Sequence, residues 1–140
     1  MSGLSPGSTL GRYLIGERIG AGGMGEVFEA EDRKLGRRVA IKVLHGALAL
    51  DPLGRSRFER EARAAAALNH ANIVTVHSVE EEGGLLYIVM ELVQGMQLNK
   101  RIPTEGLPRA QLFEWAVALA DAVSAAHAQG VVHRDLKPQN

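Results

Sequence analysis

The sequence predicts an α+β fold, in which a small β-sheet with one helix is followed by a mainly helical segment. Five short apolar runs with strand character lie between Tyr13 and Leu92, and one alanine-rich helical stretch interrupts them. From about Pro108 to Gln129 the apolar residues recur at helical spacing instead. We therefore place a boundary between two parts near residue 93.

The first eleven residues are rich in Gly, Ser and Pro and show no periodicity. Such a segment buries too little apolar surface to order itself. We expect a flexible lead-in over residues 1–11, a sheet-containing part over residues 12–93 and a mainly helical part over residues 94–140.

Composition limits the classes of function. The 16 basic residues balance the 16 acidic ones without long blocks of either sign, so we expect no nucleic acid partner. The chain has no cysteine, which excludes disulfides and thiolate chemistry. No apolar run approaches the roughly 18 residues of a membrane span, and no signal peptide is recognisable. We expect a cytoplasmic chain with no membrane segment of its own, and an anchor beyond residue 140 is left open.

Gly20, Gly22 and Gly25 form a G-x-G-x-x-G pattern between predicted strands at Tyr13–Ile19 and Val27–Ala30. Without a Cβ atom, the backbone can lie against phosphate oxygens and offer N–H donors to them. Dinucleotide-binding proteins share the pattern, but in them a helix opens at the glycines, whereas a strand follows here. A flexible turn without a ligand is the alternative when the glycines are taken alone.

Lys42 lies within an apolar strand predicted over Arg38–Leu44. An ammonium group removed from water costs several kcal/mol unless an anion lies nearby, so a buried Lys42 implies a partner. The alternative is a lysine whose aliphatic stem lies along apolar surface while its charge stays in water.

Glu61 is the candidate anion, on a helix predicted over Phe58–Leu68 and opened by a capping box of Ser56 and Glu59. Glu61 shares a stripe with the apolar residues at positions 58, 65 and 68, so we expect it to face the core. A local pair with Arg57 is the alternative. We favour a pair with Lys42, because it explains two charges at once.

Two further strands are predicted at Ile73–Val79 and Leu85–Leu92, joined by an acidic turn over residues 80–84. A short helical stretch follows near residues 98–102. The long helix from Pro108 is closed by Gly130 and leads into a short predicted strand at residues 131–132. No further helices follow to cover its apolar face, so we expect that face to stay exposed; its residues are Leu112, Ala116, Leu119, Val123 and Ala126.

The last eight residues, 133–140, read His-Arg-Asp-Leu-Lys-Pro-Gln-Asn. They place a carboxylate, an ammonium group and an amide two and three residues apart, where Pro138 prevents a continuing helix. In phosphoryl transfer, this pattern supplies an Asp that accepts the proton of the attacking hydroxyl and an Asn that binds a metal ion. A polar surface loop with this sequence by chance is the alternative.

Together these residues resemble the protein kinase family, and specifically the Ser/Thr kinases of eukaryotic (Hanks) type that also occur in bacteria. Residues 20–27 are similar to the glycine-rich loop, residues 39–42 to the strand with the ATP-binding lysine, and residues 133–140 to the catalytic loop. Glu61 matches the glutamate of helix C by its position. The Gly-Gly-Met-Gly sequence and the many Ala and Arg residues are typical of a bacterial member.

The resemblance covers residues 12–140 and implies a five-stranded antiparallel N-lobe sheet with helix C, then the first helices of an α-helical C-lobe. It implies that Lys42, held by Glu61, binds the α and β phosphates of ATP. The other implied nucleotide-binding positions are Ile19, Gly20, Ala21, Gly22, Gly23, Met24, Gly25, Val27, Ala40, Met90 as gatekeeper, and Glu91 and Val93 in the hinge.

For catalysis, the resemblance implies that Asp135 is the base, that Lys137 contacts the transferred phosphate and that Asn140 binds Mg²⁺. It further implies ATP and Mg²⁺ as cofactors and a protein partner with a Ser or Thr acceptor. Arg134, before Asp135, implies activation through a phosphorylated activation loop.

The Asp-Phe-Gly metal site and the activation segment of the family would lie beyond Asn140. We therefore expect a kinase fragment that ends at the catalytic loop, and no kinase activity in the isolated chain, since a single Asn is a poor Mg²⁺ site. The alternative function is a non-catalytic module that binds a nucleotide or a partner. Intact Lys42, Glu61, Asp135 and Asn140 argue against it.

Overall fold

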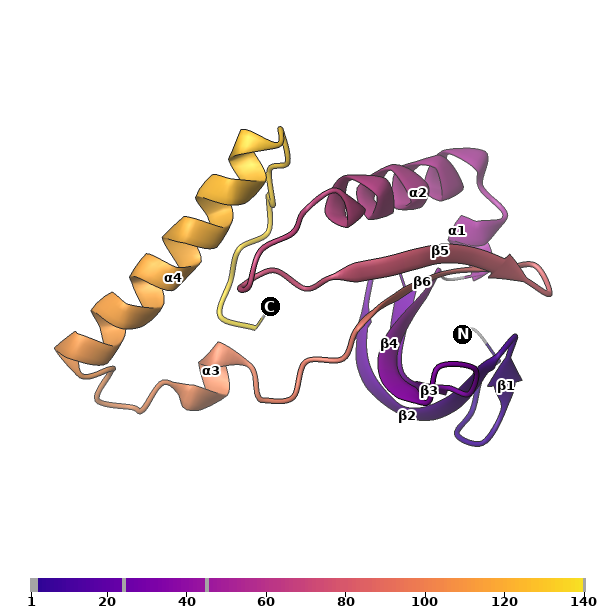
Figure 1. Ribbon diagram of the computed structural model, residues 1–140, viewed down its shortest axis with the longest axis horizontal. Coiled ribbons are helices and arrows are strands. Elements are labelled where there is room, and N and C mark those ends of the chain that lie inside the picture. Colours follow the sequence, from indigo (N-terminus) through magenta and orange to yellow (C-terminus); the bar gives the residue numbers. More distant parts are fainter. Residues whose placement is uncertain (1–2, 24, 45, 140) are drawn as a thin grey trace. The chain divides into compact units, whose positions relative to one another are not determined.

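A computed structural model describes residues 3–23, 25–44 and 46–139 of the chain (Figure 1). These residues form two compact units. The first unit contains the residues up to Ala67 together with Val74–Val93, and the second contains Leu68–Ile73 and the residues from Gln94 onward. Each unit has its own elements, and the chain passes from one to the other on both sides of residues 68–73.

The first unit is built on one antiparallel sheet with strand order β1-β2-β3-β4-β6-β5 (Figure 1). Its strands are β1 (Thr9–Leu10), β2 (Tyr13–Gly22), β3 (Gly25–Asp32), β4 (Arg37–Leu44), β5 (Val76–Glu82) and β6 (Leu85–Glu91). Together with the helices of the second unit, this sheet confirms the predicted α+β class.

β1 is the strand that the sequence does not predict. It pairs with the start of β2, and Leu10 is buried in the core. The backbone of Ser8 also accepts a hydrogen bond from Ile15 N–H. The expectation of a flexible lead-in through residue 11 is therefore wrong for these residues. Composition could not show that β2 offers an edge for them to pair with.

The core consists of two clusters of buried side chains. One lies within the sheet and contains Leu10, Tyr13, Ile15, Phe28, Ala30, Val39, Ile41, Val43, Tyr87 and Val89. The other joins the sheet to helix α2 and contains Leu44, Phe58, Ala62, Leu86 and Ile88. Strand β4 supplies residues to both clusters, as its nearly continuous apolar sequence allows.

Helix α2 (Pro52–Ala66) begins earlier than predicted. Its N-cap is Asp51, whose carboxylate accepts hydrogen bonds from Leu53 N–H at 3.2 Å and Gly54 N–H at 3.0 Å. Proline in the first turn suits the helix because its fixed φ is already helical and its missing N–H would have no partner there. The predicted capping box at Ser56 and Glu59 is therefore wrong, and both residues lie inside the helix. A short helix, α1 (Gly46–Ala49), precedes it.

The β5–β6 hairpin differs from the predicted acidic turn. β5 runs on to Glu82, and only Gly83 and Gly84 form the connection, with φ angles of 58° and 78°. Two successive left-handed residues match the twist of a two-residue hairpin, and glycine adopts them without steric cost.

The carboxylate of Glu80, on β5, accepts hydrogen bonds from three hydroxyl groups. Tyr13 Oη and Ser78 Oγ donate to its Oε1 at 2.9 and 2.7 Å, and Tyr87 Oη donates to its Oε2 at 3.1 Å. Partial burial acts to raise the pKa of Glu80, but these bonds and nearby Arg12 hold it below its ordinary value. β2 and β5 are separated in the sheet by β3, β4 and β6. The hydrogen bond from Tyr13 to Glu80 therefore connects two strands that do not pair with each other.

The second unit contains helix α3 (Leu98–Arg101) and helix α4 (Arg109–Ala128), both close to prediction. Its segment 68–73 is held to α4 by His70, whose Nε2 lies 2.9 Å from Asp121 Oδ2. On the predicted apolar face of α4, Leu112 and Leu119 are each 50% exposed, whereas Val123 is half-buried. Within the ranges that the structure describes, no helix is long and apolar enough to cross a bilayer.

α4 ends in a Schellman motif. Gly130 has a φ of 75°, its N–H donates to His127 C=O, and Val131 N–H donates to Ala126 C=O. Residues 131–132 are not a strand as predicted, because the turn uses the N–H of Val131 and no neighbouring strand is recorded beside it among the described residues.

We expect Glu80→Gln to lower the free energy of unfolding at pH 7 by about 1 to 3 kcal/mol, since a charged acceptor of three hydroxyls is lost. Because folding lowers the pKa of Glu80, its carboxylate stabilises the fold above the ordinary pKa of 4.5. This stabilisation is lost as the pH falls from 4.5 through the lowered pKa. Chemical denaturation between pH 7 and pH 3 measures this. Glu81→Gln, which removes an ion pair of Glu81 with Arg55 at the surface, is the matched control and should change stability by less than about 1 kcal/mol. Equal effects of the two substitutions would contradict the role of Glu80.

Candidate functional site

The glycine pattern lies at the tip of the β2–β3 hairpin, in the first unit. Gly20 pairs with Val27, Ala21 with Glu26 and Gly22 with Gly25. The predicted glycine-rich hairpin is therefore confirmed. Met24 lies outside the described residues.

The glycines of this hairpin fall into two kinds. A Cβ atom on Gly25 would collide with the backbone oxygen of Val43 on β4, so glycine is required there by the sheet itself. A Cβ atom on Gly22 or Gly23 would meet no atom within 4 Å, and neither residue has a left-handed φ. The described chain gives no steric reason for glycine at these two positions. Bare backbone that faces open space fits the close approach of a ligand, and phosphate oxygens are the acceptors that such N–H groups suit.

Lys42 lies on β4 directly opposite Val27 of β3 and Ile88 of β6, and its side chain is half-buried. Ala40, two residues earlier and therefore on the same face, is 5% exposed and lies opposite Met90. This face therefore brings together Val27, Ala40, Lys42 and Met90 from three adjacent strands. Ile19 on β2 is 51% exposed.

Glu61 does not face the core, contrary to the prediction. It is exposed, while Phe58 and Ala62 are the residues of this part of α2 that pack on the sheet. Within the described ranges, Glu61 forms an ion pair with neither Lys42 nor Arg57. The prediction placed the buried face of the helix along the wrong residues. The buried face follows an i, i+4 spacing from Phe58 to Ala62, and Glu61 lies roughly a quarter turn away from it.

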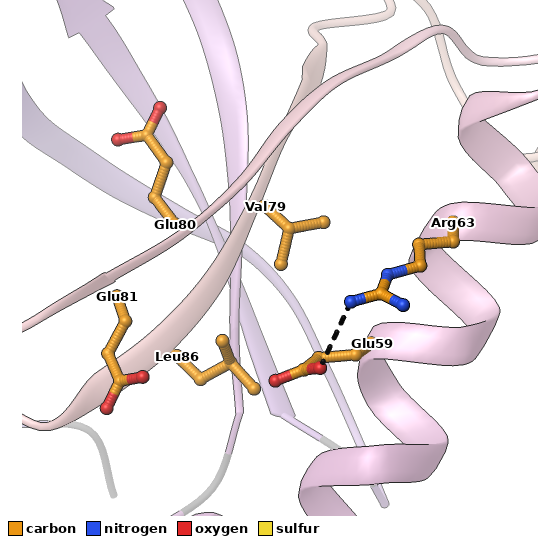
Figure 2. A pocket seen from close by; sticks show the side chains of 6 residues that line it. All are labelled: Glu59, Arg63, Val79, Glu80, Glu81 and Leu86. Atoms are coloured by element: carbon orange, nitrogen blue, oxygen red, sulfur yellow. Dashed lines mark ion pairs between the residues drawn. The ribbon is translucent and has the colours of Figure 1, made fainter.

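Glu59 and Arg63 are two charged residues of α2 that lie beside the strands (Figure 2), as Arg55 does through its ion pair with Glu81. Figure 2 shows Glu59 and Arg63 beside a hollow that is also lined by Val79 and Leu86 and by two acidic residues of β5, Glu80 and Glu81. Arg63 Nη2 lies 3.7 Å from Glu59 Oε2. Sequence reasoning assigns Glu59 to a helix cap and misses this position, because the true start of α2 was not recognised.

At the end of β6, the backbone N–H of Glu91 donates to Thr75 C=O at 2.9 Å, and its Oε2 accepts from Thr75 N–H at 3.2 Å. Val93 follows with 62% of its surface exposed. The predicted hinge residues thus begin at a strand end that is fastened to the segment before β5.

The loop after α4, in the second unit, is anchored and ordered. Lys137 Nζ lies 2.8 Å from Asp135 Oδ2, and Asp135 N–H donates to His133 Nδ1 at 3.2 Å. Pro138 C=O accepts from Asn99 N–H at 2.9 Å, which ties the loop to α3. Arg134 has a φ of 65°, a left-handed conformation that costs of order 1 to 3 kcal/mol for a residue with a side chain.

Such strain is found mainly where a backbone is held for function, so it counts against a chance surface loop. Asn140 lies outside the described residues. Among the residues that are described, no group of three or more His, Cys, Asp or Glu side chains could hold a metal ion.

The first unit has an antiparallel sheet with a glycine hairpin and a lysine-bearing strand, and the second has an anchored Asp-x-Lys loop after a long helix. These are the elements of a phosphoryl-transfer domain of the kinase type. The protein kinase domain family matches residues 13–140, and the chain belongs to this family. Members use ATP and Mg²⁺.

The curated relatives include bacterial serine/threonine kinases. The chain is 45% identical to serine/threonine-protein kinase PknA of Mycobacterium tuberculosis over 93% of its own length and 32% of PknA. It is 44% identical to PknB of the same species over 97% of its length and 22% of PknB. A probable serine/threonine-protein kinase of Streptomyces coelicolor is 43% identical over 93% of the chain and 20% of that protein. The predicted resemblance to bacterial Hanks-type kinases is thus confirmed.

Solved structures agree with the fold. The PknI kinase domain of Mycobacterium tuberculosis has a TM-score of 0.78 at 35% identity, over 98% of this chain and 56% of that one. The apo form of PpkA-294 has a TM-score of 0.85 at 26% identity, over 100% of this chain and 57% of that one. The chain therefore spans between a fifth and a third of the curated relatives named above, and a little over half of these solved chains.

We expect alanine substitutions at Gly25 and at Gly22 to have different effects on stability and on ATP binding. Gly25→Ala should lower the free energy of unfolding by several kcal/mol, because its Cβ has no space beside Val43. Gly22→Ala should leave stability within about 1 kcal/mol of the wild type, yet weaken ATP binding, because its Cβ occupies space that a ligand would use. Urea denaturation and nucleotide titration measure the two effects. A Gly22→Ala chain that binds ATP as tightly as the wild type would contradict the assignment.

Proposed function

We propose that this chain provides the nucleotide site and the catalytic loop of a Ser/Thr protein kinase, which transfers the γ-phosphate of ATP to a Ser or Thr hydroxyl of a protein. The observation that carries the proposal is the Asp135–Lys137 pair at 2.8 Å, in an anchored loop of a chain whose named relatives are Ser/Thr kinases.

The nucleotide would lie against the glycine hairpin and β4. Backbone N–H groups of residues 20–25 would bind phosphate oxygens, and Lys42 would bind the α and β phosphates. Adenine would contact the apolar side chains of Ile19, Val27, Ala40 and Met90, with backbone hydrogen bonds from Glu91 and Val93. The open space at Gly22 and the shared face of Val27, Ala40 and Lys42 support this arrangement.

Asp135 would accept the proton of the attacking hydroxyl while the hydroxyl oxygen forms a bond to the γ-phosphorus. The bond between the γ-phosphorus and the β-phosphate oxygen would break, and ADP would leave. Lys137, already beside Asp135, would hold the carboxylate in orientation and contact the transferred phosphate. ATP would supply the phosphoryl group when bound, and Mg²⁺, for which Asn140 would be a ligand, would reduce its negative charge.

Glu61 remains the proposed partner of Lys42. Because Glu61 is exposed, the pair would form only after α2 turns by roughly a quarter turn. The present geometry, without this pair among the described residues, also favours a second candidate: a module that binds a nucleotide or a partner without catalysis.

The two candidates differ in the effect of Asp135→Asn. In the intact protein that carries this chain, we expect phosphoryl transfer to fall by about 10²- to 10⁴-fold, since a general base is lost, while ATP binding stays within about twofold. Transfer of labelled phosphate to a generic Ser/Thr substrate and nucleotide titration measure the two quantities.

Glu105→Gln, an exposed carboxylate of the same unit, is the control and should leave transfer unchanged. Undiminished transfer by Asp135→Asn would refute the role of Asp135. A wild-type protein that binds ATP but transfers no phosphate would support the non-catalytic candidate instead.

A further inference from the structure

The base of the glycine hairpin is irregular. The pairing of β2 with β3 shifts register twice, once between Ile15 and Arg18 and once between Arg18 and Gly20. Each shift places an extra β2 residue opposite the partner strand and interrupts the hydrogen-bond ladder. Beyond the second shift, the hairpin tip is paired through Gly20, Ala21 and Gly22. The two glycines have no side chain and the alanine has only a methyl group, so these residues add little packing.

The ion pair of Arg18 with Glu26 is a cross-strand interaction that spans this irregular stretch. Arg18 Nη1 lies 2.9 Å from Glu26 Oε1, although Arg18 is in register with Phe28 rather than with Glu26. Glu26 is only 6% exposed, whereas the Arg18 side chain is 54% exposed. A charge-assisted hydrogen bond to a buried carboxylate is stronger than a surface ion pair, because the carboxylate has little water to replace its partner.

We propose that the Arg18–Glu26 ion pair holds the glycine hairpin across its bulged base and so positions the backbone N–H groups of residues 20–23 for nucleotide phosphates. Arg18 and Glu26 are then positioning residues for the phosphates. This inference rests on the proposed ATP site. It concerns the phosphates more than the adenine, because only Ile19 and Val27 of the proposed adenine contacts belong to the hairpin. Ala40 and Met90 lie on β4 and β6, which pair with each other in unbroken register.

The chain offers a matched control. Arg38 Nη2 lies 2.7 Å from Glu29 Oε2, so this pair also joins an arginine to a glutamate of β3. It lies between β3 and β4, whose register is continuous from Gly25 to Asp32. Backbone hydrogen bonds there hold the strands without help from the side chains.

The test compares ATP with adenosine, by protein-observed NMR titration of the purified chain. Arg18→Met should weaken ATP binding by about 5- to 10-fold and change adenosine binding by less than twofold. Glu26→Gln should also weaken ATP binding. The double variant should bind no more weakly than the weaker of the two single variants, because both substitutions remove the Arg18–Glu26 ion pair. Arg38→Met should leave both affinities unchanged. Should Arg18→Met not fold, Arg18→Gln is measured in the same way, with thermal unfolding as the check.

Other results overturn the inference. An equal loss for adenosine and ATP in Arg18→Met would mean that the pair only stabilises the fold. Unchanged or tighter ATP binding by Glu26→Gln, with weaker binding by Arg18→Met, would mean that Arg18 acts on the phosphate directly. A wild-type chain that binds adenosine and ATP equally well, or neither, refutes the proposed ATP site as well, whereas normal ATP binding by every variant refutes only the role of the ion pair.

Discussion

The carboxylate of Glu80 is the constraint on which the first unit depends. Tyr13 on β2 and Tyr87 on β6 both donate to it, and their rings meet edge to face with centroids 6.2 Å apart. Strands from the two sides of the sheet are thereby joined in its core. A single carboxylate satisfies three hydroxyl groups that would each be costly to leave without a partner.

The two halves of β2 differ in burial and in the regularity of their pairing. Tyr13 and Ile15 in the first half are buried and held by the core, whereas the second half is more exposed and carries both register shifts. The glycine hairpin therefore extends from a fixed base through an irregular segment. The proposed role of the tip in phosphate binding needs such a combination, since the tip must approach a ligand closely while its N–H groups keep their direction.

The loop after α4, in the second unit, is supported differently. Its support comes from the Schellman turn after α4, the hydrogen bond from Asn99 to Pro138 and the short pair of Asp135 with Lys137. These contacts sustain a left-handed Arg134 that would otherwise relax. Both units thus present polar groups on backbone that is held by neighbours outside the motif itself.

The sequence alone determined most of the elements and indicated the chemistry. Period-two and helical patterns located five strands and three helices, while the glycines, Lys42 and the terminal loop indicated phosphoryl transfer, because spacing along the chain limits which groups can meet within one element. Tertiary structure decided which face of each element is buried. Glu61 was assigned to the core from a stripe that suited its spacing, but the packing of Phe58 and Ala62 on the sheet turned it outward. Glu80 looked like part of an acidic turn, yet it accepts from Tyr13, 67 residues away. Partners so far apart in sequence leave no local pattern, so only the folded chain could reveal them.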